Sequence, residues 1–332
     1  MSTPSSPALP PGVRRVLVAG NGGPAIAARI RAARPDLEVR DAAPADVTAE
    51  DLAWADALVA FRVPPVCRPS GHSGSVQAQL GSVRWVQSTG AGVDPWLEAG
   101  LLPDNVLLTR SSESFGPMIA EWVVSRIFAI QLQLLPLADA QRRGQWAPRD
   151  IPRVAGTHAV LLGTGDIGRA VATVLSGLGV RVSGVSRSGQ SGHPAFSAMH
   201  RVEALAEVVH DADWLVVSTP DTPATRGLVS REVLSRCRGA VLLNAGRGAV
   251  VEETAIPEAL NAGRLRGAAL DVFVEEPLPA SSPLWSDSRV LVSPHISGLT
   301  TAEGAAGAFL ENLAAIERGQ VPTWAVDRAR GY

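Results

Sequence analysis

Lysine is absent from this chain of 332 residues, so all 30 basic residues are arginine. The arginines are scattered and the formal net charge is −2, which leaves no basic stripe of the kind that binds nucleic acid. Cysteine occurs only twice, and neither Cys67 nor Cys237 belongs to a C-x-x-C pair or a histidine cluster. We therefore expect reduced thiols and neither a disulfide framework nor a metal site.

Long uninterrupted apolar runs are also missing. The longest apolar helix candidate, 118–137, contains Glu121 and Arg126 and is a poor membrane span. Residues 1–12 lack the basic-then-apolar pattern of a signal peptide. We expect a cytoplasmic protein that binds no membrane, and the length together with 46% apolar residues indicates about two globular domains.

Apolar, β-branched segments alternate with helix-length segments in both parts of the chain. In the first part, strands are expected at 13–19, 37–40, 57–61, 85–87 and 106–108, with a helix at 25–33. One long helix, 117–140, should follow. The second part predicts strands at 158–162, 181–185, 214–218, 240–244, 267–270 and 290–293, joined by helices at 167–178, 203–210, 230–237 and 253–262. This alternation predicts an α/β protein with two doubly wound parallel sheets, the second of about six strands. A final helix at 300–318 should fold back on the first domain.

Two glycine-rich turns compete as a dinucleotide site. Gly20-x-Gly22-x-x-Ala25, with Asp41 downstream, matches a relaxed fingerprint. The second turn has all three glycines and opens a predicted helix, whose N-terminus supplies N–H donors to a pyrophosphate. We favour this second loop, which consists of Gly163, Thr164, Gly165, Asp166, Ile167 and Gly168.

The strand after the second loop ends in Ser186, Arg187 and Ser188. An NAD-binding chain usually has an acid there to accept from the ribose 2′-OH. Serine removes that negative charge and Arg187 adds a cation, so NADP(H) is favoured and NAD(H) remains possible. The alternative is a solvent-facing arginine on a strand-to-helix loop.

Three side chains at predicted strand ends suggest chemistry on a small acid. Arg247, in N-A-G-R-G, suits a carboxylate because its planar fork binds both oxygens. His295, in S-P-H-I-S-G, can give and take a proton near neutral pH. Glu275 and Glu276 precede Pro277, and one of them should reach the site and favour charged imidazole. Each residue alone has a structural alternative: a salt bridge, a core histidine or a solvated loop carboxylate.

A second anion site is expected in the first domain. Residues 88–94 follow a predicted strand, and successive small residues at Gly90, Ala91 and Gly92 expose backbone N–H groups. This loop could hold a substrate carboxylate or could be an ordinary tight turn. Arg62, at an earlier strand end, could add a second cation.

Together these motifs resemble the D-isomer-specific 2-hydroxyacid dehydrogenase family. The resemblance covers most of the chain and rests on L-G-T-G-D-I-G, N-A-G-R-G, A-A-L-D-V-F-V-E-E-P-L, S-P-L-W and V-S-P-H-I-S. It implies that Arg247 binds the substrate, that Glu276 partners the acid/base His295, and that Asp271 orients the nicotinamide. The expected cofactor set also includes Thr219, Pro220, Ala245, Gly246 and Gly298.

The same resemblance implies a Rossmann cofactor domain, 111–296, inserted into a flavodoxin-like substrate domain, 1–110 and 297–332. It also implies a homodimer built through the long helix after residue 116. P-M-I-A-E-W, V-S-R-S and S-P-L-W look most like the glyoxylate/hydroxypyruvate reductase branch. Formate dehydrogenases of the superfamily have glutamine where Glu276 stands, which argues against that activity.

The leading hypothesis is NAD(P)H-dependent reduction of a small 2-keto acid to the D-2-hydroxy acid. A related substrate, such as a phosphonate or a sugar-derived keto acid, stays open. So does a non-catalytic protein that uses the fold to sense a dinucleotide, although the Arg/Glu/His set weighs against it.

Overall fold

The computed structural model describes residues 9–10, 12–20, 22–67, 80–97, 102–111 and 115–332. The chain forms two compact units: unit 1 comprises Met1–Ser114 and Thr300–Tyr332, and unit 2 comprises Phe115–Leu299. The boundaries expected from the sequence were at 110 and 296. Unit 2 is thus inserted, as one continuous segment, between the two segments of unit 1.

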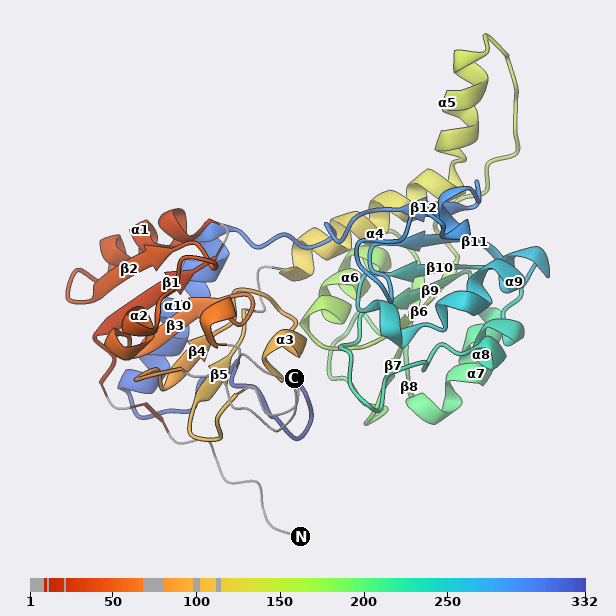
Figure 1. Ribbon diagram of the computed structural model, residues 1–332. Helices are drawn as coiled ribbons and strands as arrows, with labels where there is room; N and C mark the ends of the chain where they lie inside the picture. Colours follow the sequence, from red (N-terminus) through yellow and green to blue (C-terminus); the bar gives the residue numbers. More distant parts are fainter. Residues whose placement is uncertain (1–8, 11, 21, 68–79, 98–101, 112–114) are drawn as a thin grey trace. The chain divides into compact units, whose positions relative to one another are not determined.

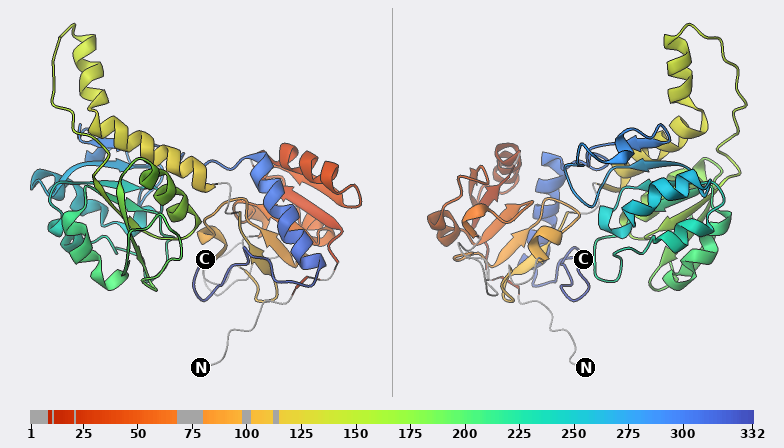
Figure 2. Two further views of the ribbon diagram at one scale, coloured as in Figure 1. Left: turned by 180° about the vertical axis from the view of Figure 1, so that it is seen from behind. Right: turned by 45° about the vertical axis from the view of Figure 1, so that its right-hand side comes forward.

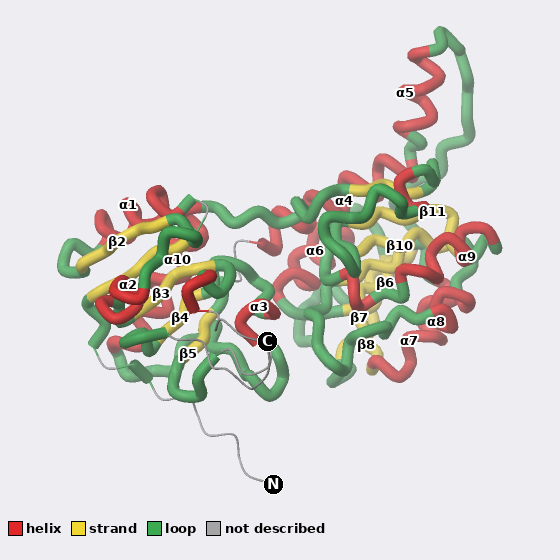
Figure 3. The backbone as a smooth tube through the Cα atoms, viewed as in Figure 1, coloured by secondary structure: helices red, strands yellow, loops and turns green. Residues whose placement is uncertain are grey.

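Unit 1 contains a five-stranded parallel sheet in the order β2-β1-β3-β4-β5 (Figures 1 and 3). This is the flavodoxin-like order. The strands are β1 (Arg15–Ala19), β2 (Glu38–Ala42), β3 (Ala57–Ala60), β4 (Trp85–Gln87) and β5 (Leu107–Thr109). The helices are α1 (Gly23–Ala33), α2 (Ala49–Trp54), α3 (Asp94–Leu97) and α10 (Ala302–Glu317), with a 3-10 turn, η1, at Pro65–Cys67.

Both faces of this sheet are covered. Helices α1 and α10 lie side by side over one face (Figure 2), where Ile30 and Phe309 are buried. Leu52 of α2 and Trp96 of α3 cover the other face. Trp85 stacks on Phe309 with ring centroids 4.8 Å apart, which ties α10 to β4. The expectation that the C-terminal helix folds back on the first domain is confirmed.

Unit 2 contains a seven-stranded parallel sheet in the order β12-β11-β10-β9-β6-β7-β8. The switch between β6 and β9 is that of the Rossmann fold, extended by one strand. The strands are β6 (His158–Leu162), β7 (Arg181–Ser186), β8 (Ala198–Arg201), β9 (Trp214–Val217), β10 (Ala240–Asn244), β11 (Leu265–Leu270) and β12 (Val290–Val292). The expected strands are all present, and β8 was missed because this edge strand is short and only half-buried.

The helices of unit 2 divide between the two faces of its sheet. One buried cluster joins α7, α8 and α9 to the strands, and α4 packs along α6. The helices are α4 (Phe115–Gln131), α5 (Leu134–Arg142), α6 (Asp166–Gly177), α7 (Leu205–Val208), α8 (Arg231–Arg236) and α9 (Ile256–Asn261). The 3-10 turns are η2 (Val202–Ala204), η3 (Val209–Asp211), η4 (Gly248–Val250), η5 (Glu253–Ala255) and η6 (Pro283–Trp285).

The expected single helix over 117–140 is wrong. The chain bends by 57° between α4 and α5, and Gln133 adopts the left-handed conformation with φ 52°. Pro136 explains the break, because in a continuous helix its ring would clash with the carbonyl of Leu132. Helix α5 and the segment after it stand away from the rest of unit 2 (Figures 1 and 2).

No single helix within the described residues is long and apolar enough to span a membrane, although the bent pair of α4 and α5 passes the same test together. Both cysteines are free and fully buried. Burial raises the pKa of each thiol to about 11, so thiolate chemistry is disfavoured at Cys67 and Cys237.

Candidate active site

The loops at the carboxyl edge of the unit 2 sheet touch one another in strand order. A Cβ built on Gly163, after β6, would lie 2.8 Å from Ser218 Oγ, after β9. A Cβ on Gly246, after β10, would lie 2.8 Å from the carbonyl oxygen of Thr219. Because only glycine permits these approaches, the loops form one continuous rim at the edge where doubly wound sheets bind ligands.

The rim continues toward β12 through two further contacts. A Cβ on Gly248 would overlap the backbone of Phe273, so the loop carrying Arg247 lies against the loop after β11. The His295 N–H then donates to the Asp271 carbonyl oxygen at 2.8 Å. The predicted arginine, carboxylate and histidine are therefore placed on three consecutive loops of one sheet edge.

The glycine loop after β6 has the form of a phosphate cradle. Gly163 has φ +106°, and a Cβ on Gly168 would overlap the Gly163 carbonyl oxygen. A Cβ on Gly165 meets no atom within 4 Å, and α6 begins there without a side-chain cap. The Thr219 Oγ1 is buried without a hydrogen-bond partner in the described part of the chain. A helix N-terminus without a side-chain cap, an unobstructed glycine and a buried hydroxyl without a partner among the described residues fit a dinucleotide.

The end of β7 has no acid. Ser186 Oγ accepts the Gly189 N–H at 3.2 Å, and Ser188 Oγ accepts the Gln190 N–H at 3.3 Å, so both serines shape the turn. Arg187 between them is exposed. This geometry fits a 2′-phosphate better than a bare ribose diol.

The competing glycine turn in unit 1 is a structural turn at the start of α1. Gly22 caps α1 with φ 78°, and Asn21 lies outside the described residues. Asp41, the candidate ribose acid, forms an ion pair with Arg31 at 2.7 Å.

Arg247 is held by a residue that sequence reasoning missed. The Asn244 side chain accepts the Gly246 N–H at 3.1 Å and donates to the Arg247 carbonyl at 3.0 Å. The Arg247 guanidinium donates to the Gly246 carbonyl at 2.8 Å. The asparagine in N-A-G-R-G was the available signal, since a buried asparagine at a strand end commonly clips the following turn.

His295 and Glu276 form a direct pair. His295 Nδ1 lies 2.8 Å from Glu276 Oε2, and the two side chains are 43% and 35% exposed. The other oxygen, Glu276 Oε1, accepts the Phe273 N–H at 3.0 Å. A carboxylate anchored on backbone and facing one imidazole nitrogen leaves the other nitrogen for a substrate.

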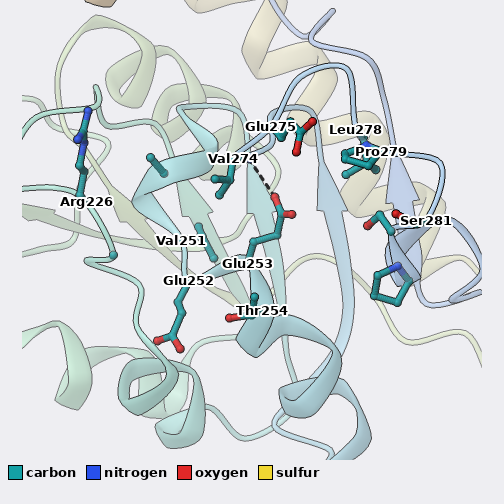
Figure 4. Close-up of a pocket in the computed structure, with 14 residues that line it drawn as sticks. Arg226, Val251, Glu252, Glu253, Thr254, Val274, Glu275, Leu278, Pro279 and Ser281 are labelled. Atoms are coloured by element: carbon teal, nitrogen blue, oxygen red, sulfur yellow. Dashed lines mark hydrogen bonds between the residues drawn. The ribbon is translucent and has the colours of Figure 1, made fainter.

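Glu275 points elsewhere. It lines a cavity of about 660 Å³ together with Glu253 and Leu278, and Arg247, Glu276 and His295 are not among the lining residues (Figure 4). Glu253 Oε2 accepts the Val274 N–H at 3.0 Å, drawn as a dashed line in Figure 4. Of the two candidate acids, Glu276 is the one beside the histidine.

The remaining predicted cofactor residues lie along the same rim. Thr219 and Pro220 follow β9, and Ala245 and Gly246 follow β10. Gly298 lies against α4, since its Cβ would come within 3.1 Å of Ile119 and Phe115 side-chain atoms. Their contact with a nucleotide remains a prediction.

In unit 1, one backbone N–H of the expected anion-binding loop already has a hydrogen-bond partner within the loop. The Gly90 N–H already donates to Ser88 Oγ at 3.3 Å, which leaves Ala91 and Gly92 as the better donors. A Cβ on Gly90 would lie 2.5 Å from the Phe61 ring. Arg62 is exposed and its guanidinium lies 5.6 Å from the Phe61 ring centroid.

Comparison with known proteins agrees with this geometry. The family model of the D-isomer specific 2-hydroxyacid dehydrogenase, NAD binding domain, matches residues 124–297. A glyoxylate/hydroxypyruvate reductase A of Serratia proteamaculans is 32% identical over 264 residues, which are 77% of this chain and 83% of that protein.

Two solved structures have the same fold over nearly all of the chain. A D-isomer specific 2-hydroxyacid dehydrogenase from Xanthobacter autotrophicus Py2, in complex with NADPH and MES, gives a TM-score of 0.85 at 32% identity, covering 97% of this chain and 100% of that one. An NADPH-dependent glyoxylate/hydroxypyruvate reductase from Sinorhizobium meliloti, in complex with NADP and sulfate, gives 0.82 at 28%, covering 96% and 100%. The chain belongs to the D-isomer specific 2-hydroxyacid dehydrogenase family and is an NAD(P)-dependent dehydrogenase of that family.

Proposed function

We propose that the chain reduces a small 2-keto acid, such as glyoxylate or hydroxypyruvate, to the D-2-hydroxy acid with NADPH. The observation that carries the proposal is the 2.8 Å contact between His295 Nδ1 and Glu276 Oε2 on the rim of the Rossmann sheet. An imidazole held by a carboxylate is a competent proton donor to a carbonyl oxygen.

Each of the three side chains has a distinct task in this proposal. Arg247 binds the substrate carboxylate through its guanidinium. His295 donates its Nε2 proton to the oxygen on C2, and Glu276 keeps the imidazole oriented through Nδ1. Bound NADPH would supply the hydride for C2. Asp271 Oδ1 already accepts two hydrogen bonds and Oδ2 accepts one, so Oδ2 is the oxygen that would accept from the nicotinamide amide.

The preference for NADPH follows from the end of β7. Ser186 stands where an acid would repel a 2′-phosphate, and Arg187 adds a cation. Relatives solved with NADPH or NADP support this assignment. The loop after β6 would hold the pyrophosphate through the N-terminus of α6.

Unit 1 has a candidate anion-binding loop of its own. Ala91 and Gly92 follow a loop whose Gly90 amide is already engaged by Ser88. We assign the Ala91 and Gly92 N–H groups to the substrate carboxylate and Arg62 to the selection of the substrate's side chain. Backbone N–H groups of successive small residues suit an anion.

A homodimer is the proposed assembly. Helix α5 stands away from unit 2 and exposes Leu134, Leu135 and Leu137, and Trp146 after it is 97% exposed. Contiguous exposed apolar side chains on a projecting element are typical of a subunit interface. Both cysteines being free thiols fits the reducing cytoplasm as the proposed location.

Steady-state kinetics of His295→Gln test the proposed reaction. We expect turnover of glyoxylate and hydroxypyruvate with NADPH to fall by at least ~10²-fold, the usual contribution of a general acid. His210→Gln, an exposed histidine beside Asp211, serves as the control and should keep wild-type turnover. A His295→Gln variant with near-wild-type turnover would reject the assignment.

A panel of 2-keto acids, read by NADPH oxidation at 340 nm, separates the substrate alternatives. Highest kcat/KM on glyoxylate or hydroxypyruvate supports the proposal, and highest kcat/KM on a phosphonate or sugar-derived keto acid replaces the substrate while keeping the mechanism. Tight NADPH binding without turnover on the whole panel would indicate a dinucleotide sensor.

A further inference from the structure

Ser293, the residue that follows β12, joins a helix to the loop of His295. Its hydroxyl donates to Asp271 Oδ1 at 2.5 Å and accepts the Trp122 Nε1–H at 3.1 Å. Trp122, Asp271 and Ser293 are all buried, and Asp271 is 0% exposed. A chain of buried hydrogen bonds therefore runs from the middle of α4 to the sheet edge.

Asp271 directs both carboxylate oxygens at the segment just after His295. Its Oδ1 also accepts the Ile296 N–H at 3.0 Å, and its Oδ2 accepts the Ser297 N–H at 2.7 Å. A buried carboxylate without such donors would be costly. The two N–H groups are therefore strongly held, and the backbone on the carboxyl side of His295 is fixed.

His295 itself has a backbone that needs holding. Its φ is +53°, in the left-handed region that non-glycine residues seldom adopt. Its N–H donates to the carbonyl oxygens of Asp271 at 2.8 Å and Ser293 at 3.1 Å. Backbone of this kind persists where the surroundings over-determine it, and such residues cluster at functional sites.

We propose that Ser293 and Trp122 are positioning residues that act through Asp271 to aim the His295 imidazole. The inference rests on the proposed function, because it needs His295 to be the proton donor. Removing the Ser293 hydroxyl leaves Asp271 Oδ1 with the Ile296 donor only and lets the 295–297 backbone shift. A misplaced catalytic group lowers turnover. Cofactor binding should be kept, because the phosphate cradle after β6 is untouched and Ser293 bonds Asp271 Oδ1 and not Oδ2, the oxygen proposed for the nicotinamide amide.

The experiment compares Ser293→Ala with Ser183→Ala. Ser183 is also a buried serine of the same sheet, and its hydroxyl lies 2.8 Å from His158 Nε2, away from the rim. Ser293→Ala loses two buried hydrogen bonds and Ser183→Ala loses one, so both variants should melt at a lower temperature than wild type. Only Ser293→Ala should lower kcat, by ~10- to 100-fold, with an unchanged Kd for NADPH measured by fluorescence titration.

The solvent isotope effect on kcat is a readout that lost stability would not move. It should rise in Ser293→Ala, because proton transfer from a misaligned imidazole limits turnover, and stay at the wild-type value in Ser183→Ala. Trp122→Phe removes one N–H while keeping a ring, and it should lower kcat in the same direction by a smaller factor. Should Ser293→Ala fail to fold, the kcat and isotope effect of Trp122→Phe decide between the outcomes.

Three outcomes have distinct meanings. Reduced kcat with a raised isotope effect in both variants supports the inference. Wild-type kcat and isotope effect in Ser293→Ala and Trp122→Phe, together with an inactive His295→Gln, overturn it while the proposed function stands. An active His295→Gln overturns both, since there is then no proton donor to position.

Discussion

His158, the first residue of β6, is buried with both ring nitrogens engaged. Nδ1 lies 3.0 Å from the Asp211 carbonyl oxygen and Nε2 lies 2.8 Å from Ser183 Oγ. Burial lowers the pKa of this imidazole below its ordinary value. In the unfolded chain it regains a pKa of about 6.5, so below that pH the unfolded state binds a proton that the folded state resists.

His158 therefore makes unfolding easier in acid. Its contribution to the free energy of unfolding is complete above about pH 6.5 and declines as pH falls below it. We expect the Tm of wild type to drop more between pH 7.5 and 5.5 than that of His158→Gln. His158→Gln itself should lose ~1–2 kcal/mol at pH 7.5 through its hydrogen bonds. His200→Gln on edge strand β8 is the control, and equal pH sensitivity in wild type and His158→Gln would contradict the account.

Ser186 offers a second test at a single position. Ser186→Asp places a carboxylate where NAD-binding chains accept from the ribose 2′-OH and where a 2′-phosphate would be repelled. We expect the ratio of kcat/KM with NADPH to that with NADH to fall by at least ~10-fold, since ~1.4 kcal/mol is a factor of ten. Ser188→Asp, two residues on, should change the ratio less. An unchanged ratio in Ser186→Asp would argue against the 2′-phosphate assignment.

Strands and helices with a clear apolar pattern in the sequence were predictable, whereas those determined by their tertiary surroundings were not. The strand 158–162 was predicted with its observed bounds because the mostly apolar segment H-A-V-L-L directly precedes the glycine turn at Gly163. Strand β8 escaped because its residues are half-exposed. The break before α5 was missed although Pro136 indicates it. For the site, strand-end motifs predicted Arg247 and His295. The local Asn244 contacts were missed although N-A-G-R-G indicates them, whereas the contact between Ser293 and Trp122 joins residues 171 positions apart and no local pattern encodes it.

The glycine loop at the start of α6 allows the proposed pyrophosphate site to be tested with one glycine-to-alanine substitution. A Cβ on Gly165 meets no protein atom within 4 Å, so Gly165→Ala should fold normally but place a methyl group where the backbone must approach the pyrophosphate. We expect the Kd for NADPH to rise by at least ~10-fold, the cost of losing about one hydrogen bond to a charged group. Gly177→Ala, at the other end of α6 and equally open, should bind NADPH as wild type does. Unchanged NADPH binding by Gly165→Ala would contradict the assignment of the pyrophosphate to this loop.

The chain folds into two α/β units, and unit 2 carries a projecting arm, defined here as α5 and residues 143–153. The apolar side chains of the arm, Leu134, Leu135 and Trp146 among them, are exposed, whereas eight of the 17 residues of α4 are buried. This contrast within one continuous segment favours the proposed homodimer, in which each subunit would present the same patch.

Charge placed on the arm should separate the subunits of the proposed homodimer. A leucine buried at a two-fold interface counts twice, so Leu135→Glu should weaken association by at least ~10²-fold. Light scattering coupled to size exclusion should show a dimer for wild type and a monomer for Leu135→Glu. Arg142→Glu, an exposed charge reversal on the same helix, should stay dimeric. A monomeric wild type, or a dimeric Leu135→Glu at the same concentration, would refute the interface.

Because unit 2 (Phe115–Leu299) lies between the two segments of unit 1, the ribosome synthesises all of unit 2 before it completes unit 1. All seven strands of the unit 2 sheet lie within this one continuous segment, so unit 2 can fold during translation. The unit 1 sheet is synthesised first, but the apolar face that Phe309 covers stays exposed until α10 leaves the ribosomal exit tunnel. Nascent chains halted before Thr300 should therefore recruit chaperones through their N-terminal part.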